Sequence, residues 1–329
     1  MKKLMTVFAA AVATVGLAGP AQAAPATITF CAAPGGNLHL SDGGTCKNNW
    51  TPIAVGNGAA VTALQNQVAL LQAQVAALQT QVTNLQANYT ALQNLLAGVT
   101  RNGSTLVFTN MNLQLVNGMG STATKNGHGN LIVGYNENAG DQSGSHYVMV
   151  GNGHSFSSWG GMLAGQSNTA SGPWASVHGG ANNVASGIHA TVAGGDSNIA
   201  SGPGSSAVGG GGNTAAGIQS TVSGGGGNTA QADQSSVTGG NNNDAVGHGS
   251  SVTGGIFNIA SGARAVVVGG GVNKATGTES AVVSGAFNEA NGLQSAVLGG
   301  ERNKADGHRS TVVGGFGLVE AAAFGVGGP

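Results

Sequence analysis

Charged side chains are the scarcest feature of this sequence. Only 6% of its 329 residues are Asp, Glu, Lys or Arg, and none of the four occurs between Asn48 and Thr100. The surface of an ordinary globular enzyme is about a quarter to a third charged, so this composition argues against that class of protein. The formal net charge of −1 also gives no reason to expect a nucleic acid or an anionic membrane as partner.

Long apolar runs are confined to the N-terminus. An apolar stretch at residues 4–17 follows two lysines and precedes an Ala-Gln-Ala sequence at residues 21–23. This order is typical of a secretory signal peptide, which we place at residues 1–23; a retained anchor is the alternative. No later stretch is long enough to span a membrane as a helix. We therefore expect a mature chain without a membrane-spanning segment, secreted or held at the cell surface.

Cysteine is nearly absent, since Cys31 and Cys46 are the only two. In an exported protein such a pair is expected to form a disulfide. A metal site made of both cysteines and His39 is the alternative, but it lacks a fourth ligand. These residues belong to a small N-terminal module, which we place at residues 24–57.

Glycine, by contrast, is abundant, and much of it belongs to one phrase that recurs every 15 residues between residues 168 and 315. The phrase reads N-x-A-x-G-x-x-[SA]-x-V-x-G-G-x-x. Its asparagines are Asn168, Asn183, Asn198, Asn213, Asn228, Asn243, Asn258, Asn273, Asn288 and Asn303. A fixed repeat of this length indicates a repeat architecture.

The fixed residues of the phrase alternate, which is the periodicity of a strand. Two short strands joined by glycine turns make one coil of a β-solenoid, with Asn, Ala and Val inward and coils roughly 4.8 Å apart. Glycine supplies the positive φ angles of tight corners, and the stacked asparagines are expected to bond one another as amide ladders do. The sequence therefore predicts an all-β repeat domain of 15-residue coils at residues 128–316.

The outward positions beside the buried valine become aliphatic toward the end of the repeats. The four large aliphatic residues there are Val268, Val283, Leu298 and Val313. A thin coil buries little apolar surface by itself, so an outward aliphatic column indicates association. We expect this face to pack against other copies of the chain.

A different period, of seven residues, precedes the repeats and predicts a coiled coil at residues 58–100. Its apolar seam residues in the predicted interface are Val61, Leu64, Val68, Leu71, Val75, Leu78, Val82, Leu85 and Leu92. The flanking positions are mostly glutamine, so the pairing has no charge pattern and should be insensitive to salt. A β-branched residue at one seam position with leucine at the other usually favours two strands, and the seam alone leaves dimer and trimer open.

Two shorter segments complete the division of the chain. Residues 101–127 are expected to form a β connector, and residues 317–329 a small apolar tail. Five aromatic residues gather at the start of the repeats, where they are expected to cap the solenoid as repeat proteins require. They are Tyr135, Tyr147, Phe156, Trp159 and Trp174.

The phrase Val-x-Gly-(Gly)-x-x-Asn-x-Ala-x-Gly-x-x-Ser resembles the head repeat of trimeric autotransporter adhesins, the YadA-like β-roll, over about residues 130–315. The combination of coiled coil and β-roll in one exported chain is also similar to that family. The resemblance implies a left-handed parallel β-roll, a homotrimer with three rolls side by side, and adhesion at a surface. The sequence departs from the family in that the coiled coil precedes the repeats and no segment after Gly315 is long enough for a C-terminal membrane anchor.

No catalytic constellation is visible in the sequence. The acidic residues are scattered singly, and the glycine runs lack the Gly-Lys-Ser/Thr of a phosphate loop. We expect no enzyme activity, no cofactor and no metal. The expected function is a secreted or surface-displayed adhesive rod that binds itself and a surface or matrix ligand of unknown identity. A subunit of an extracellular fibre or phage-like appendage is the first alternative, and an ice- or crystal-binding solenoid is the second.

Overall fold

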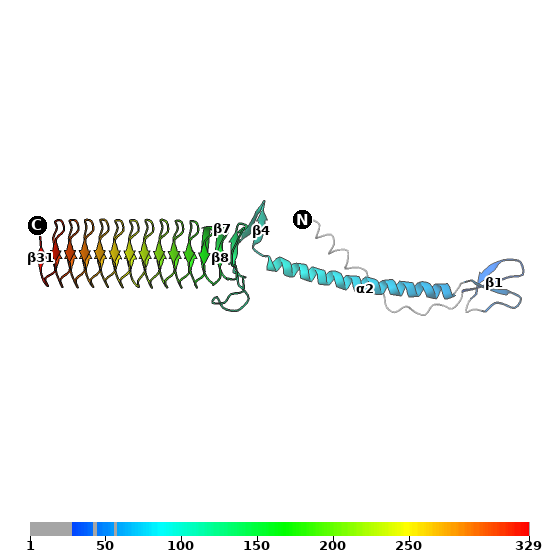
Figure 1. Cartoon of the computed structure of the whole chain (residues 1–329). Coiled ribbons are helices and arrows are strands. Elements are labelled where there is room, and N and C mark those ends of the chain that lie inside the picture. The colour runs from blue at the N-terminus through cyan, green and yellow to red at the C-terminus, as the bar shows by residue number, and fades with distance from the viewer. Residues whose placement is uncertain (1–27, 42–44, 56–57, 329) are drawn as a thin grey trace. The chain divides into compact units, whose positions relative to one another are not determined.

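The structure is a computed structural model that describes residues 28–41, 45–55 and 58–328. The predicted signal peptide at residues 1–23 lies outside the described residues. The chain divides into two compact units, with the boundary between Asn112 and Leu113. Figure 1 shows the elements of both units.

The N-terminal module of the first unit is a three-stranded antiparallel sheet. Its strands are β1 (Ile28–Ala32), β2 (Leu38–Leu40) and β3 (Thr51–Val55), in the order β2-β1-β3. A disulfide joins Cys31 of β1 to Cys46, with 5.5 Å between their Cα atoms. A module this small has little core, so the crosslink limits the freedom of its unfolded chain.

The helix α2 (Gly58–Leu95) follows the module and is shorter than the coiled coil predicted at residues 58–100. Gly98 ends this region with a φ of +89°, a conformation that glycine adopts readily after a helix. A side chain at Gly98 would also approach the Thr109 carbonyl oxygen to 2.5 Å. The chain then forms a hairpin of β4 (Val99–Asn102) and β5 (Thr105–Phe108).

The second unit is a parallel β-solenoid with two long sheets, as the repeat predicts (Figure 1). We call the 14-stranded sheet that carries the buried valines the valine sheet. Its strands are β6 (Leu131–Val133), β7 (Val148–Asn152), β9 (Met162–Gln166), β11 (Ser176–Val177), β13 (Thr191–Val192), β15 (Ser206–Ala207), β17 (Thr221–Val222), β19 (Ser236–Val237), β21 (Ser251–Val252), β23 (Val266–Val267), β25 (Ala281–Val282), β27 (Ala296–Val297), β29 (Thr311–Val312) and β31 (Val326–Gly327).

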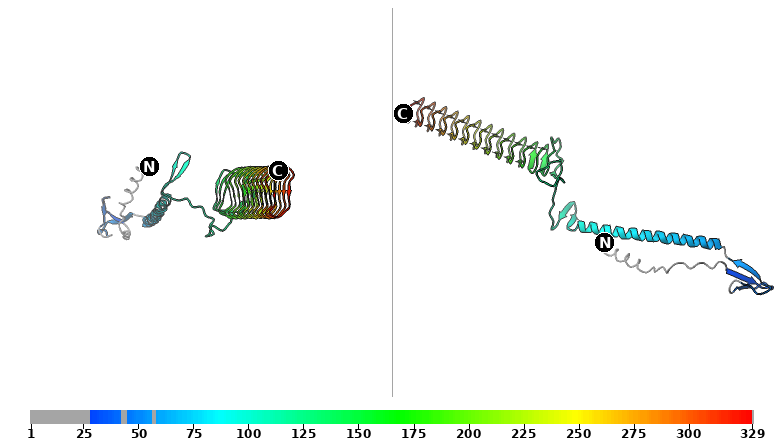
Figure 2. Two further views of the ribbon diagram at one scale, coloured as in Figure 1. Left: turned by 90° about the vertical axis from the view of Figure 1, so that its left-hand side faces the viewer. Right: turned by 90° about the horizontal axis from the view of Figure 1, so that it is seen from below.

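The other sheet has 12 strands and is here called the alanine sheet. Its strands are β8 (Ser155–Phe156), β10 (Thr169–Ala170), β12 (Val184–Ala185), β14 (Ile199–Ala200), β16 (Thr214–Ala215), β18 (Thr229–Ala230), β20 (Asp244–Ala245), β22 (Ile259–Ala260), β24 (Lys274–Ala275), β26 (Glu289–Ala290), β28 (Lys304–Ala305) and β30 (Val319–Glu320). The solenoid viewed nearly along its length shows the coils stacked in register (Figure 2).

The interior of the solenoid is one residue thick at each position. In the coil of Asn243, the side chains of Asn243, Ala245 and Val252 are all 0% exposed. The same three columns are buried in the other regular coils, which confirms the inward assignment of Asn, Ala and Val. Larger side chains would not fit between sheets joined by such short corners, because protein interiors are close-packed.

The buried asparagines bond their neighbours in the stack, as predicted, but each side chain bonds backbone groups and not the side-chain amide of the next asparagine. Asn243 Oδ1 accepts a hydrogen bond from the backbone N–H of Asn258 at 2.9 Å. Asn243 Nδ2 donates to the carbonyl oxygens of Gly239 at 3.1 Å and Gly255 at 2.9 Å. Each asparagine thus satisfies corner groups of its own coil and of the next. A buried backbone group without such a partner would cost about 1–3 kcal/mol.

The second glycine of each Gly-Gly pair is required by the backbone. Gly255 has a φ of +87°, and a side chain there would lie 2.2 Å from the carbonyl oxygen of Gly270 in the next coil. Glycine alone combines that conformation with so close a contact. The geometry of the corner in a single chain is therefore enough to require glycine as the second residue of the pair.

Coils near the start of the solenoid depart from the regular repeat. The pairing from β9 to β11 brings Leu163 opposite Val177, one residue short of the 15-residue spacing. Tyr147 and Phe156 fill the interior there, each 1% exposed and with ring centroids 5.2 Å apart. Tyr135, at 93% exposed, is not part of this cluster. The predicted aromatic cluster therefore holds for the two buried rings and not for Tyr135.

The solenoid continues past residue 316, where the sequence suggested a separate tail. Strand β30 pairs with β28, and β31 pairs with β29. Leu318 occupies the asparagine position of this coil, packs on the core and donates its N–H to Asn303 Oδ1 at 2.9 Å. The backbone ladder maintains the coil although the phrase has been lost.

Replacing Val252 by Asp should open the coils around β21. The carboxylate would be buried among Val and Ala side chains without a partner, which we expect to destabilise the solenoid by about 3–5 kcal/mol. Thermal unfolding followed by circular dichroism measures the change. Ser261→Asp, at an exposed position of the next coil, is the matched control. Equal melting of both variants and the unmodified protein would contradict the inward assignment.

Candidate interaction surfaces

The outward face of the valine sheet is a flat, two-column surface. In each regular coil it consists of the residue before the buried valine, which is half-buried in most coils, and the residue after it, which is exposed. The predicted interface residues of this face are between 39% and 50% exposed, and they are Val268, Val283, Leu298 and Val313. The structure thus leaves these four aliphatic side chains uncovered in a single chain.

No Asp, Glu, Lys or Arg stands in either column from β6 to β29. The charges of the C-terminal coils lie instead on the alanine sheet and at the corners. On the alanine sheet Lys304 Nζ lies 2.9 Å from Glu289 Oε2, and this hydrogen bond holds the pKa of Glu289 below its usual value. Charge is therefore absent from one sheet face and present on the other.

The first glycine of each Gly-Gly pair borders the valine-sheet face and has no structural reason within one chain. A side chain built at Gly239, Gly254 or Gly269 would meet no atom within 4 Å. None of these three has a positive φ. Ser284 stands in the same column, which shows that a side chain is tolerated there. Glycine retained where the coil does not need it favours close approach of another backbone from outside.

The apolar seam of α2 is likewise uncovered. The seam residues of the predicted interface are 47–65% exposed; they are Leu64, Val68, Leu71, Val75, Leu78, Val82, Leu85 and Leu92, while the Val61 side chain lies outside the described set. A 38-residue helix without a charged residue and without a packed face is not expected to be stable alone in water. Removal of this exposed seam from water would be favourable.

The N-terminal module offers no metal site of the kind weighed from the sequence. Both cysteines are consumed by the disulfide, and His39 packs on Trp50 with ring centroids 5.0 Å apart. Among the described residues, no group of three His, Cys, Asp or Glu side chains could hold a metal ion.

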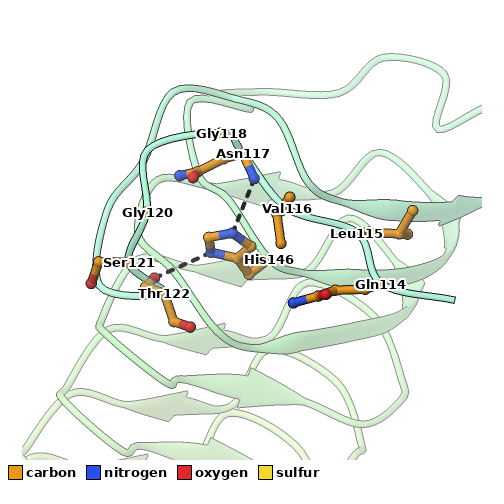
Figure 3. A pocket seen from close by; sticks show the side chains of 9 residues that line it. All are labelled: Gln114, Leu115, Val116, Asn117, Gly118, Gly120, Ser121, Thr122 and His146. Atoms are coloured by element: carbon orange, nitrogen blue, oxygen red, sulfur yellow. Dashed lines mark hydrogen bonds between the residues drawn. The ribbon is translucent and has the colours of Figure 1, made fainter. Parts of the chain in front are cut away.

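A cavity of about 610 Å³ lies where residues 114–122 pass over His146 (Figure 3). Asn117 donates its backbone N–H to His146 Nε2 at 3.3 Å, and the other ring nitrogen lies 3.2 Å from the Thr122 carbonyl oxygen. Nε2 therefore acts as the acceptor of this hydrogen bond. The cavity is lined by two glycines and by apolar and uncharged polar side chains besides His146, without a carboxylate or ammonium group. The His146 ring bonds the backbone of the loop at residues 117–122, and no second catalytic group lines the cavity with it.

A buried histidine takes the place of an asparagine in the ladder, which sequence reasoning missed. His154 is 0% exposed and lies 14 residues before Asn168. Its Nδ1 accepts the Asn168 N–H at 3.3 Å, and its Nε2 lies 3.2 Å from the Val150 carbonyl oxygen. The imidazole thus bonds the backbone as the asparagine amide does in later coils. The 14-residue spacing from Asn168 was the signal that could have revealed it.

The sequence also did not predict two columns of corner residues that have side chains and yet adopt a left-handed backbone conformation. One runs through Trp174, His189, Arg264 and Glu279, with φ values of 54–58° at positions that hold glycine in other coils. Such a conformation costs about 1–2 kcal/mol for a residue with a side chain. Axial contacts offset it here. Trp174 stacks on His189 at 4.9 Å, and Arg264 pairs with Glu279 at 2.7 Å.

No protein-family profile matches the chain, and no curated protein shows significant similarity to it. Among the described residues, no helix is long and apolar enough to cross a membrane.

Alkaline pH should open the first coils through Tyr147. Burial raises the pKa of Tyr147 to about 12, whereas an unfolded tyrosine titrates near about 10. The stability that this shift contributes is present below pH 10 and is lost as the pH rises from about 10 to 12, by about 2–3 kcal/mol. Unfolding of these coils can be followed by the fluorescence of Trp159 and Trp174. Tyr147→Phe should lose less stability between pH 8 and pH 11.5, and identical losses would refute this account.

Proposed function

We propose that this protein is a secreted or surface-displayed adhesive rod whose copies associate side by side. The valine-sheet face and the seam of α2 are the contacts between copies. The arrangement resembles that of trimeric autotransporter adhesins in placing three left-handed β-rolls together, and it differs from theirs in that the coiled coil precedes the rolls. The rod presents its remaining faces to a surface or matrix ligand.

The observation that carries this proposal is the uncharged valine-sheet face bordered by unexplained glycines. A solvated surface of this length normally carries both signs of charge. This face carries none, exposes aliphatic side chains at its end and lacks side chains along one border. Those properties suit contact with an identical face, because the removal of such a surface from water is favourable at about 25 cal/mol per Å².

The uncovered helix supports the same proposal independently. A glutamine-flanked seam without charges gives no preference for a charged partner. The seam repeats over the full helix, so copies of the same helix in register bury it completely. Association through both contacts should persist at high salt, because neither relies on ion pairs.

The molar mass of the purified chain should equal three copies in solution. Light scattering measures it at 0.15 M and 1 M salt, and we expect the same value at both. A monomer at micromolar concentration would contradict the association, and a dimer would contradict the three-fold arrangement.

Leucine substitutions at Gly254 and Gly255 should have opposite effects. Gly254→Leu places a side chain in open space on the proposed contact, so we expect folded coils but weaker association, with a mass below that of three copies. Gly255→Leu forces a clash with Gly270, so we expect loss of the local coils by circular dichroism. Full association of Gly254→Leu would show that this border is not part of the contact.

The adhesive role can be tested with beads coated with the full protein. Coated beads should bind extracellular matrix or cell surfaces above the level of bare beads, at both low and high salt. Beads coated with the Gly255→Leu variant are the control, because they show whether binding depends on folded repeats. Equal binding by coated and bare beads would leave a rod without an adhesive function and refute this part of the proposal.

A further inference from the structure

The side chains at one corner of the solenoid become large and apolar in the C-terminal coils. This corner follows the valine sheet, and we call its apolar part the Phe257 corner, formed by Ile256, Phe257, Val272 and Phe287. Ile256, Phe257 and Phe287 are 53%, 54% and 47% exposed. Earlier coils hold small or polar residues at the same positions, namely Ala181, Asn182, Asp196, Ser197, Gly211, Gly212, Gly226, Gly227, Asn241 and Asn242.

The large residues of this corner adopt a backbone conformation that disfavours them. Phe257, Val272 and Phe287 have φ values of 56°, 57° and 57°. Glycine and asparagine suit this left-handed region, whereas a β-branched or bulky residue in it is an outlier. The coils of Asn182 and Asn242 show that the fold itself accepts asparagine there.

Contacts within the chain do not explain all of these residues. Phe287 lies 5.3 Å from the Arg302 guanidinium, which also covers Phe316 at 5.6 Å. Phe257 and Val272 have no comparable contact, since no ring or cation pairs with Phe257 anywhere in residues 58–328. Backbone hydrogen bonds from Phe257 N–H to the Asn241 carbonyl and from Val272 N–H to the Ile256 carbonyl hold this conformation. Asn242 makes the same bond, so these bonds do not account for the bulky side chains, and strained residues of this kind are characteristic of functional surfaces.

An unpaired cation stands beside the apolar strip. Lys274 follows Val272 by two residues, is exposed, and forms no ion pair or side-chain hydrogen bond with the described part of the chain. Neighbouring coils pair their cations, as in Arg264 with Glu279 and Lys304 with Glu289. Glu289 stands opposite Lys274 in register and its carboxylate feels the charge of Lys274, but its hydrogen bond goes to Lys304. The ammonium group of Lys274 therefore keeps donors for a carboxylate supplied from outside.

We propose that the Phe257 corner and Lys274 form a docking site for an acidic peptide segment that carries aliphatic or aromatic side chains. Phe257 and Phe287 lie two coils apart, about 10 Å, with the smaller Val272 between them. One large apolar side chain of the partner packs between the two rings while a nearby carboxylate binds Lys274. The inference rests on the proposed adhesive function, because it names the kind of ligand that such a rod holds.

Asparagine substitutions separate this role from a structural one. Phe257→Asn and Phe287→Asn place a residue that the fold already uses at this corner, so the melting temperature should rise or stay unchanged. Binding of a synthetic peptide of alternating Leu, Phe and Asp, measured by fluorescence anisotropy on the full protein, should weaken at least tenfold. Ile188→Asn, at an exposed apolar residue outside this corner, is the matched control and should bind as the unmodified protein does.

The charge is tested by Lys274→Gln and by a peptide with Asn in place of Asp. Each should weaken binding several-fold, and the Lys274→Gln variant should show less salt dependence. The proposal is overturned if the unmodified protein does not bind the acidic peptide, if Ile188→Asn loses binding equally, or if the asparagine variants melt lower. Binding to neutral phospholipid vesicles in preference to the peptide would overturn it as well. Molar mass measured on the same samples reports self-association separately, so either proposal can fail alone.

Discussion

The side chain of one buried asparagine per coil holds the repeat domain together. Two-residue strands give few hydrogen bonds, and the corners between them leave backbone groups inside the solenoid. The asparagine amide satisfies an N–H of the next coil and carbonyl groups of two coils. It therefore fixes both the shape of a corner and the distance to its neighbour. With that bond in place, the interior needs only Ala and Val to be filled.

Because the interior is so uniform, differences between coils are confined to the outside. The valine-sheet face carries no Asp, Glu, Lys or Arg from β6 to β29 and gains aliphatic residues toward its end, the alanine sheet gains ion pairs, and the corners vary most. Repeat proteins stack so that each unit contacts only its neighbours, and outward residues can therefore change one coil at a time. In this protein the change is grouped: the C-terminal coils carry the aliphatic column, the aromatic corner and most of the charges. The outer surface of the solenoid is therefore chemically most varied in these coils.

The sequence predicted the repeat domain well where spacing alone decides the structure. The columns of Asn, Ala and Val read directly as inward positions, because a strand alternates its side chains. The partners of Asn243 could not be predicted, because the corner geometry brings its amide to carbonyls 4 residues before and 12 residues after it. Val272 and Trp174 in left-handed conformations contradict residue preference, so no local signal marks them. The coil of Leu318 was missed because the phrase is lost while the backbone pairing continues. The predicted interface residues are exposed in one chain, and their partners depend on copies that a single sequence does not specify.

The asparagine ladder also has a direction. Asn168 Oδ1 accepts from Asn183, Asn183 from Asn198, and so on toward Asn303 and Leu318. Each coil thus presents a side-chain oxygen and an amide N–H to the coil that follows, and a backbone N–H and a glycine carbonyl to the coil that precedes. Either end of a folded stretch therefore offers partners for one more coil, so the solenoid can lengthen by one coil at a time from an existing end.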